Sequence, residues 1–309
     1  MPFPTARHIW MDGELVPWEE ANVHVLTPTL HYGYGVFEGI RAYATDRGPA
    51  AFHLEAHVSR LFASAKIYPP LDEIPYAHSE IVAAVKATIR ANGHEGGCYI
   101  RPIVYLGYGE MGVNPLPSRP QMAIATWEWG AYLGEEAFER GVRVMTSSFR
   151  RIGKNTIPPA AKACGQYLNS SLAKVEAVRA GYDEAIMLSE EGFISEGTGE
   201  NVFIVRDGVL LTPPLSDGPL GGITRASVMQ IARDLDIPVQ ETSLVRSDLY
   251  LADEAFLTGT AAEVVPIRSA DGRGIGERGP ITARVQSTFV DVVHGRIDRY
   301  KDWLAFVYE

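Results

Sequence analysis

One lysine and one glutamate, each surrounded by small residues, are the side chains of this sequence best suited to chemistry. Lys162 lies in NTIPPAAKACGQYLNS and is the only charged residue between Asn155 and Gln166. An amine packed among small apolar neighbours loses hydration, which disfavours its charged form and makes it a better nucleophile toward carbonyl compounds. Glu196 lies in GFISEGTGEN, where two glycines leave room for a flat ring to approach. A snorkelling surface lysine and a turn carboxylate are the plainer alternatives.

Features that could bind phosphate occur in three other segments. The sequence DGPLGGITRAS has a glycine turn that runs directly into a predicted helix, which places Ile223 and Thr224 at its first turn. A loop of small and hydroxyl residues contains Thr260, and Arg60 lies on an early helix with few acidic neighbours in the sequence. Taken singly, these could be a plain helix start, a loop and a surface arginine. Together with the lysine and the glutamate they fit pyridoxal 5'-phosphate, which needs an amine for its aldehyde, a carboxylate for its ring nitrogen and donors for its phosphate.

The elements of the first half of the chain are of both kinds. Alternation of apolar and polar residues around Asp12-Gly13 predicts a hairpin in HIWMDGELVP. Apolar residues at helical spacing predict helices near 54–65 and 81–89. CYIRPIVYLG and QMAIATWEW, rich in aromatic and β-branched residues, predict strands.

The pattern restarts after a linker. GVRVMTSS predicts a strand, QYLNSSLAKVEAVRAG a helix that ends at Gly181, and two hairpins follow. TRASVMQIARDLDI predicts a helix and EAFLTGTAAEVVPI a strand. Because helices and strands do not alternate strictly, we expect mixed α+β domains and not a doubly wound parallel sheet. We expect a small N-terminal domain over 1–127, an interdomain loop over 128–140 and a large C-terminal cofactor domain over 141–309.

Composition and charge argue against several classes of partner. The chain has 309 residues and a formal net charge of -10, and its longest basic run is Arg150-Arg151, so we expect no nucleic acid. Cys98 and Cys164 are too few for a disulfide framework and fit a reducing cytoplasm. We find no signal peptide pattern and no stretch approaching the ~18 apolar residues of a membrane span. We therefore expect a cytoplasmic protein, away from membranes, that acts on small molecules.

Two patterns suggest other sites, and their surroundings argue against both. Gly107, Gly109 and Gly112 match the dinucleotide-binding pattern G-x-G-x-x-G, but the NPLP that follows prevents the helix that would receive a pyrophosphate. His53 and His57 have the i, i+4 spacing of metal ligands on a helix, but no nearby Cys, His or Glu completes a set. We expect a loop between strands at the first and no metal at the second. The G-x-S-x-G pattern of α/β serine hydrolases does not occur.

Seven segments, in a fixed order and spread over nearly the whole chain, carry a resemblance: HIWMDGELVPWEEANVHVLTPTLHYGYGVFEGIRAY, YIRPIVYLG, WGAYLG, NTIPPAAKACGQYLNS, SEGTGEN, LGGITR and YLADEAFLTGTAAEVVPI. The chain resembles the fold-type IV pyridoxal-phosphate enzymes, and most closely the branched-chain amino acid aminotransferases. The resemblance implies two mixed domains of the D-amino acid aminotransferase-like type and at least a homodimer.

The resemblance also implies a role for each residue that contacts the cofactor. Lys162 would bond to the aldehyde and move the proton between the substrate Cα and the cofactor C4'. Glu196 would pair with the pyridine nitrogen, Tyr167 would hydrogen-bond the phenolic oxygen of the ring, and Leu220 would pack on the ring. The residues that would hold the phosphate are Arg60, Ile223, Thr224 and Thr260.

For the substrate, the resemblance implies two carboxylate sites and an apolar wall. Tyr99 and backbone N–H groups at Thr260 and Ala261 would bind the α-carboxylate. Arg101 matches the arginine that receives the side-chain carboxylate of glutamate or 2-oxoglutarate. Independently of the family, an arginine inside the apolar strand YIRPIVY needs a partner for its charge. The residues of the apolar wall would be Tyr32, Phe37, Trp129 and Tyr132, of which Phe37 and Trp129 could also be plain core aromatics.

The resemblance predicts an aminotransferase that moves the amino group of L-leucine, L-isoleucine and L-valine to 2-oxoglutarate by a ping-pong mechanism. Alternatives with the same fold are a D-amino acid aminotransferase, an (R)-amine aminotransferase and 4-amino-4-deoxychorismate lyase. Gly221 and Thr198, where relatives carry other residues, are small departures from the family pattern. From a different class, the alternative is a non-catalytic protein that binds small molecules, in which Lys162 would be incidental.

Overall fold

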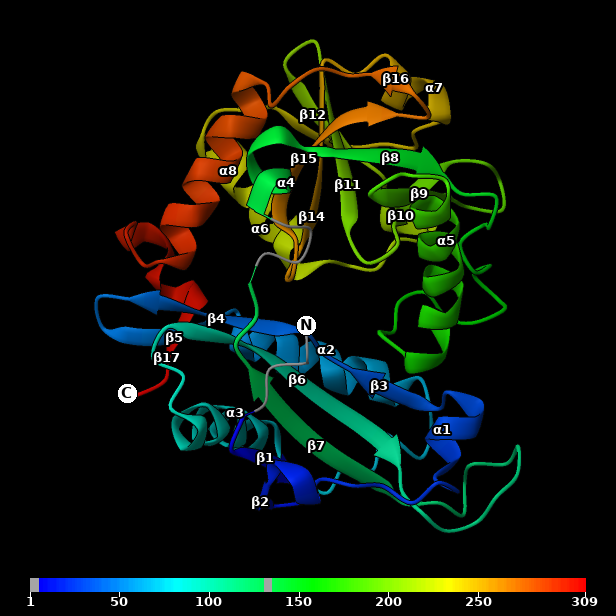
Figure 1. Ribbon diagram of the computed structural model, residues 1–309, viewed down its shortest axis with the longest axis vertical. Coiled ribbons are helices and arrows are strands. Elements are labelled where there is room, and N and C mark those ends of the chain that lie inside the picture. Colours follow the sequence, from blue (N-terminus) through cyan, green and yellow to red (C-terminus); the bar gives the residue numbers. More distant parts are fainter. Residues whose placement is uncertain (1–5, 131–134) are drawn as a thin grey trace. The chain divides into compact units, whose positions relative to one another are not determined.

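The computed structural model describes residues 6–130 and 135–309, and its internal contacts divide the chain into two units (Figure 1). The first unit contains Met1–Trp129, Ala161–Gln166 and Val292–Glu309, and the second contains Gly130–Ala160 and Tyr167–Asp291. Of the helices in the described residues, none combines the length and the apolar composition needed to cross a membrane.

The first unit contains an antiparallel sheet with eight strands within the described residues. The strand order is β17-β5-β4-β6-β7-β1-β2, and β3 pairs with β6. The hairpin predicted around Asp12-Gly13 is confirmed, because β1 and β2 pair there as antiparallel neighbours. The strands are β1 (His8–Met11), β2 (Glu14–Pro17), β3 (Gly35–Phe37), β4 (Ile40–Thr45), β5 (Gly48–Phe52), β6 (Gly97–Leu106), β7 (Pro120–Trp127) and β17 (Leu304–Phe306). The helices are α1 (Pro28–Tyr32), α2 (Leu54–Lys66) and α3 (His78–Asn92), with short 3-10 turns at Trp18–Glu20, Cys164–Gln166 and Asp298–Trp303.

The two faces of this sheet differ at strand β6, because one packs against helices and the other carries polar side chains. Ile100 and Val104 share a buried core with apolar residues of α2 and α3, such as Leu61, and Figure 1 shows both helices behind the strands. Because successive side chains of a strand point to opposite faces, Tyr99 and Arg101 lie on the face away from these helices. The strand therefore presents two polar side chains side by side without interrupting the core.

The second unit contains a mixed sheet, nine-stranded within the described residues, in the order β10-β9-β8-β15-β14-β11-β12-β13 with β16 paired to β15. Parallel pairs join β8 to β9, β8 to β15 and β12 to β13, and the other pairs are antiparallel. The strands are β8 (Val142–Thr146), β9 (Glu184–Leu188), β10 (Ile194–Gly197), β11 (Asn201–Arg206), β12 (Val209–Thr212), β13 (Val239–Glu241), β14 (Glu254–Gly259), β15 (Glu263–Ala270) and β16 (Arg273–Gly274). The helices are α4 (Glu135–Arg140), α5 (Tyr167–Arg179), α6 (Ile223–Asp234), α7 (Arg246–Tyr250) and α8 (Pro280–Val293), whose last two residues count with the first unit, and a 3-10 turn covers Leu215–Asp217.

Two features differ from the sequence-based expectations. The segment EAFLTGTAAEVVPI, predicted as strand-like with a loop of small residues at Thr260, forms two strands, β14 and β15, that pair as a hairpin in which Gly259 faces Glu263. The turn places Glu263 at φ 60°, a conformation that apolar periodicity does not reveal. In addition, 161–166 and 292–309, which we assigned to the C-terminal domain, belong to the first unit because Ala163 bridges to Val36 and β17 pairs with β5.

Candidate active site

The backbone of Lys162 is fixed on both sides by elements of the first unit. Its N–H donates to Oγ of Ser64 on α2 over 3.0 Å, and its C=O accepts from the N–H of Phe37 on β3 over 3.0 Å. The Nζ atom lies 5.1 Å from the centre of the Phe37 ring. Hydrogen bonds to a helix and to a strand thus fix the backbone of this irregular segment, and with it the point from which the Lys162 side chain extends.

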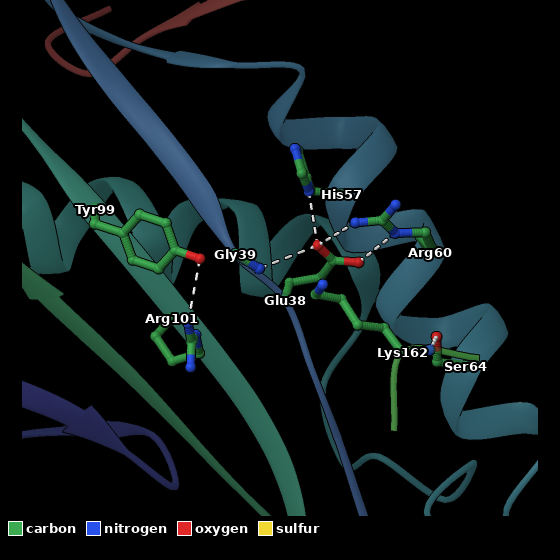
Figure 2. A network of polar contacts seen from close by, with 8 residues as sticks. All are labelled: Glu38, Gly39, His57, Arg60, Ser64, Tyr99, Arg101 and Lys162. Carbon is green, nitrogen blue, oxygen red and sulfur yellow. Dashed lines mark hydrogen bonds and ion pairs between the residues drawn. The ribbon is translucent and has the colours of Figure 1, made fainter. Parts of the chain in front are cut away.

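Arg60 is paired with a carboxylate that lies 22 residues earlier in the chain. Its Nε donates to Oε1 of Glu38 over 2.6 Å and its Nη2 to Oε2 over 2.8 Å, while Nδ1 of His57 lies 2.7 Å from Oε2 (Figure 2). This corrects our inference from sequence that Arg60 has few acidic neighbours, because the partner comes from the connection between β3 and β4.

The surroundings of Glu38 keep it charged. Its side chain has no exposed surface. Burial alone would raise the pKa of the carboxyl, but the charge of Arg60, together with the hydrogen bonds of Arg60 and His57, holds this pKa well below its usual range. The pair is therefore an ionised carboxylate and a guanidinium, packed against one face of α2.

Arg101 points from β6 into an aromatic environment. Its Nη2 donates to the hydroxyl of Tyr99 over 3.2 Å (Figure 2), and its guanidinium lies 4.8 Å from the centre of the Phe37 ring. Across the strand pair it faces Ala125, whose small side chain leaves space for it. Its Nε is buried and has no hydrogen-bond partner among the described residues. A buried donor of this kind is what an incoming carboxylate would satisfy.

The predicted apolar wall is present in part. Trp129 meets the ring of Tyr99 edge-on at 4.6 Å, and Trp127, which sequence reasoning missed, lies 5.0 Å from the same ring. Tyr32 ends α1 beside His31 and has 48% of its surface exposed. The fourth predicted residue, Tyr132, lies outside the described residues.

In the second unit, Glu196 is buried and is held by an ion pair with an arginine and by two hydrogen-bond donors. Its Oε1 pairs with Nε of Arg151 over 2.7 Å. Its Oε2 accepts from the N–H of Leu220 over 3.0 Å and from the amide of Asn201 over 3.4 Å. A shift in register between Ile194 and Glu196 marks an irregularity in β10 at this point. The carboxylate is thus fixed in orientation, and its charge is balanced by an arginine.

The start of α6 is built to receive an anion. Gly222 precedes the helix and provides no side-chain cap, and the first turn, which begins with Ile223 and Thr224, carries no acidic residue. A Cβ at Gly222 would lie 1.9 Å from Oδ1 of Asn201, so any other residue would displace the Asn201 side chain. Backbone N–H groups at an uncapped helix start favour negative charge.

The remaining predicted residues of the second unit lie at the ends of elements. Tyr167 is the first residue of α5. Thr260 and Ala261 form the turn between β14 and β15, next to Thr258, whose hydroxyl is buried without a hydrogen-bond partner among the described residues. Within this unit the turn lies close to SEGTGEN, because a Cβ at Gly259 would come within 3.4 Å of the Gly199 carbonyl oxygen.

These observations test whether the chain suits pyridoxal 5'-phosphate. An oriented carboxylate, an uncapped helix start and an adjacent hydroxyl-bearing turn match the ring nitrogen and the phosphate of that cofactor. In the described residues, no cluster of three or more His, Cys, Asp or Glu side chains is arranged to hold a metal ion. The carboxylate, the helix start and the turn together fit a phosphorylated organic cofactor.

Sequence reasoning missed Glu38, Arg151 and Asn201, and it considered His57 only as a possible metal ligand. Glu38, Arg151 and Asn201 each contact a predicted residue that lies from 5 to 45 positions away in the sequence. One signal was available for Glu38, since it is the only charged residue of the apolar run YGYGVFEGI.

Comparison with known proteins gives a consistent result. Residues 35–270 match the family described as amino-transferase class IV. The branched-chain-amino-acid aminotransferase of Pseudomonas aeruginosa is 48% identical over 301 residues, which cover 97% of each chain.

Two solved structures are similar as well. The branched-chain amino acid aminotransferase of Escherichia coli superposes with a TM-score of 0.95 at 47% identity, covering 98% of this chain and 100% of that one. A T.th. branched-chain amino acid aminotransferase, solved with pyridoxamine 5'-phosphate, has a TM-score of 0.94 at 49% identity and covers 99% and 100%. The same enzyme has also been solved with N-(5'-phosphopyridoxyl)-L-glutamate.

Proposed function

The chain belongs to the class IV aminotransferases, and on this premise we propose that it transfers the amino group of L-leucine, L-isoleucine and L-valine to 2-oxoglutarate. The family and the α+β fold class predicted from sequence are confirmed by the family match and by the solved relatives. The cofactor is pyridoxal 5'-phosphate, in agreement with the complexes of the T.th. enzyme. Bound, it supplies an aldehyde that exchanges amines and a ring that accepts electrons.

The observation that carries the substrate assignment is the environment of Arg101. This reaction requires one pocket to accept an aliphatic side chain in one half-reaction and a second carboxylate in the other. Arg101 has a buried Nε donor among the aromatic rings of Phe37, Tyr99 and Trp127. Apolar surface thus suits leucine, while the guanidinium suits the side-chain carboxylate of glutamate. A pocket without the arginine would have no cation to bind the side-chain carboxylate of glutamate.

Lys162 is the proposed catalytic residue. Hydrogen bonds with Ser64 and Phe37 fix its backbone, so the side chain that carries the amine starts from a fixed position. With the cofactor present, the amine would hold its aldehyde in the resting enzyme, and the released amine would take the proton from the substrate Cα and deliver it to C4' of the cofactor. Tyr99 and the N–H groups of Thr260 and Ala261 orient the substrate by its α-carboxylate.

The proposed cofactor contacts are those that the family resemblance implies. Glu196 would accept the hydrogen bond of a protonated ring nitrogen, which would keep the ring electron-poor. Tyr167 hydrogen-bonds the phenolic oxygen and Leu220 packs on the ring. The phosphate is held by Arg60, Ile223, Thr224 and Thr260.

We also propose a homodimer in the cytoplasm. The first unit exposes large apolar side chains, with Leu30 62% and Val113 91% exposed, and Leu30 borders a mainly apolar pocket of about 220 Å³. Exposed large apolar side chains and an apolar pocket favour association with a second copy. Both cysteines are free, which agrees with a reducing compartment. Sedimentation at several concentrations measures the subunit count.

The experiment that tests the function follows the cofactor absorbance of the purified holoenzyme during separate half-reactions. L-leucine and L-glutamate should each convert the cofactor rapidly, whereas D-alanine and (R)-1-phenylethylamine should not. Rapid conversion by D-alanine without conversion by L-leucine would assign the chain to the D-amino acid branch. A purified protein without the absorbance of the cofactor would favour a non-catalytic binding protein.

A further inference from the structure

The carboxylate of Glu38 is surrounded by hydrogen-bond donors. Besides the two bonds from Arg60, its Oε2 receives the N–H of Gly39 over 3.2 Å and lies 2.7 Å from Nδ1 of His57. Four contacts on two oxygen atoms fix both the position and the rotation of a carboxylate. The group has no surface exposed to solvent, so the donors are not exchanged for water.

His57 enters this cluster as a neutral donor. Burial lowers the pKa of the imidazole, and although Glu38 opposes this effect, the net direction is downward. An ionised carboxylate only accepts hydrogen bonds, so the proton of the neutral ring must lie on Nδ1. The charge of Glu38 is therefore balanced by Arg60, while His57 contributes orientation.

One face of α2 connects this cluster to the lysine. His57, Arg60 and Ser64 follow one another at helical spacings of three and four residues, which places them on the same side of the helix. Ser64 holds the N–H of Lys162, and Figure 2 shows the Lys162 side chain extending toward the Glu38 carboxylate. The helix thus fixes an amine and a guanidinium relative to each other.

The geometry of the pair determines which edge of the guanidinium is presented elsewhere. Glu38 binds the edge formed by Nε and one Nη2 proton, through two nearly parallel bonds. The other edge, formed by Nη1 and the second Nη2 proton, is then directed away from Glu38. A guanidinium held by one edge keeps little of the rotational freedom of a free arginine.

We propose that Glu38 is a positioning residue, which holds Arg60 in the orientation that receives the phosphate of the cofactor, and that His57 orients Glu38. This inference rests on the proposed function, in which Arg60 binds that phosphate. The charge effect and the orientation effect of Glu38 have opposite signs. A negative charge next to Arg60 weakens its attraction for a phosphate dianion, whereas a fixed orientation strengthens the contact. Whether the affinity for pyridoxal 5'-phosphate rises or falls when the charge of Glu38 is removed therefore distinguishes the charge effect from the orientation effect.

The experiment compares the affinity of full-chain variants for pyridoxal 5'-phosphate with their affinity for pyridoxal, which lacks the phosphate. Glu38→Gln removes the charge and one of the paired bonds, and Glu38→Asp keeps the charge but withdraws the carboxylate by one methylene. Both should bind pyridoxal 5'-phosphate roughly 10-fold more weakly and pyridoxal nearly as well as the parent. Glu55→Gln, on an exposed part of the same helix, is the matched control and should change neither affinity.

A double substitution gives the second arm. Arg60→Ala should also weaken the phosphorylated cofactor selectively, and Glu38→Gln combined with Arg60→Ala should be no weaker than Arg60→Ala alone, because Glu38 acts through Arg60. Additive losses, or a loss in Glu38→Gln that is equal for both ligands, would overturn the positioning role. So would unchanged or tighter binding of pyridoxal 5'-phosphate by Glu38→Gln.

Failure of the proposed function has a different outcome. If Arg60→Ala leaves the affinity for pyridoxal 5'-phosphate unchanged, then Arg60 does not bind the phosphate, and both the assignment and the inference are wrong. If only Glu38→Gln is without effect, the assignment of Arg60 stands and the role of Glu38 is wrong.

Glu38→Gln leaves a buried arginine with a weaker partner and could prevent folding. In that case the His57 variants carry the test. His57→Asn offers an N–H near the position of Nδ1 and should retain most of the affinity for pyridoxal 5'-phosphate, whereas His57→Ala should lose affinity for it but not for pyridoxal. Equal affinities of the two His57 variants would contradict the orientation of Glu38 by His57.

Discussion

Arg101 donates from Nη2 to the hydroxyl of Tyr99, two residues earlier on the same face of β6, over 3.2 Å. The pair joins the residue proposed for the α-carboxylate to the residue proposed for the side-chain carboxylate. Because the two share one hydrogen bond, substrate specificity and substrate orientation are physically linked. The effect of a substitution at either position should therefore be measured with both leucine and glutamate.

Arg101→Leu should harm glutamate far more than leucine. Removing a hydrogen-bonding cation from a carboxylate site should lower kcat/KM for L-glutamate about 100-fold, while kcat/KM for L-leucine should change less than about 5-fold. Steady-state kinetics with each amino acid measure both values. Arg119→Leu, on an exposed loop, is the control. Equal losses for both substrates would mean that Arg101 supports the fold or the α-carboxylate.

Gly39 provides the space in which the Tyr99 hydroxyl lies. A Cβ at this position would come 2.0 Å from Oη of Tyr99, so Gly39→Ala must displace the ring. We expect a loss of stability of about 1–3 kcal/mol and raised KM values for both leucine and glutamate. Gly96→Ala is the control, because a Cβ there would meet nothing within 4 Å. Thermal unfolding and kinetics of the two variants check this, and a Gly39→Ala enzyme with unchanged KM values would show that Tyr99 does not need its present position.

Arg151 balances the charge of Glu196 inside the second unit. Arg151→Met should cost roughly 3 kcal/mol or more in the cofactor-free protein, because a buried carboxylate loses its ionic partner. The loss should be smaller with cofactor bound, since a protonated ring nitrogen would then face Glu196. Denaturant unfolding with and without pyridoxal 5'-phosphate measures the difference. Arg206→Met, which breaks a partly exposed pair with Asp248, should cost less than about 1 kcal/mol in both; an identical loss with and without cofactor in Arg151→Met would argue against a ring nitrogen at Glu196.

Glu200 should make stability fall between about pH 5 and pH 8. Burial, and then the nearby carboxylate of Glu184, raise the pKa of Glu200 from its ordinary value of 4.5 to about 8. The folded state then binds a proton that the unfolded state has released, so this contribution is complete below pH 4.5 and is lost as the pH rises through 8. Glu200→Gln should flatten the dependence of the unfolding free energy on pH in this range, and the exposed Glu19→Gln should not. A Glu200→Gln protein with the parental slope would contradict a protonated Glu200.

Local patterns predicted much of the fold. The alternation around Asp12-Gly13 and the helical spacing of Leu54, Val58 and Leu61 depend on neighbours within a few residues, and both elements formed as expected. The loop at Thr260 was expected, but the pairing of β14 with β15 across it was not, because small residues in a loop do not show which strands pair on either side. The pairing of 161–166 and of β17 with the first unit depends on long-range strand contacts that no local pattern encodes.

The candidate site divides in the same way. Lys162, Glu196 and Arg101 could be selected as candidates because each is a charge in an apolar or glycine-rich setting, which is visible in sequence. Their partners were not found, since Glu38 and Arg151 lie 22 positions from Arg60 and 45 from Glu196. A charge that needs a partner predicts that one exists, but only the fold decides which residue it is.

Lys162 is the residue on which the whole account depends, and borohydride reduction tests it most directly. Reduction of the holoenzyme followed by peptide mass mapping should place the cofactor on the peptide that contains Lys162. Lys154→Ala, which removes an exposed lysine, should give the same adduct in the same amount, and Lys162→Ala should give none. An adduct on another lysine, or an undiminished adduct in Lys162→Ala, would contradict the assignment of the catalytic amine.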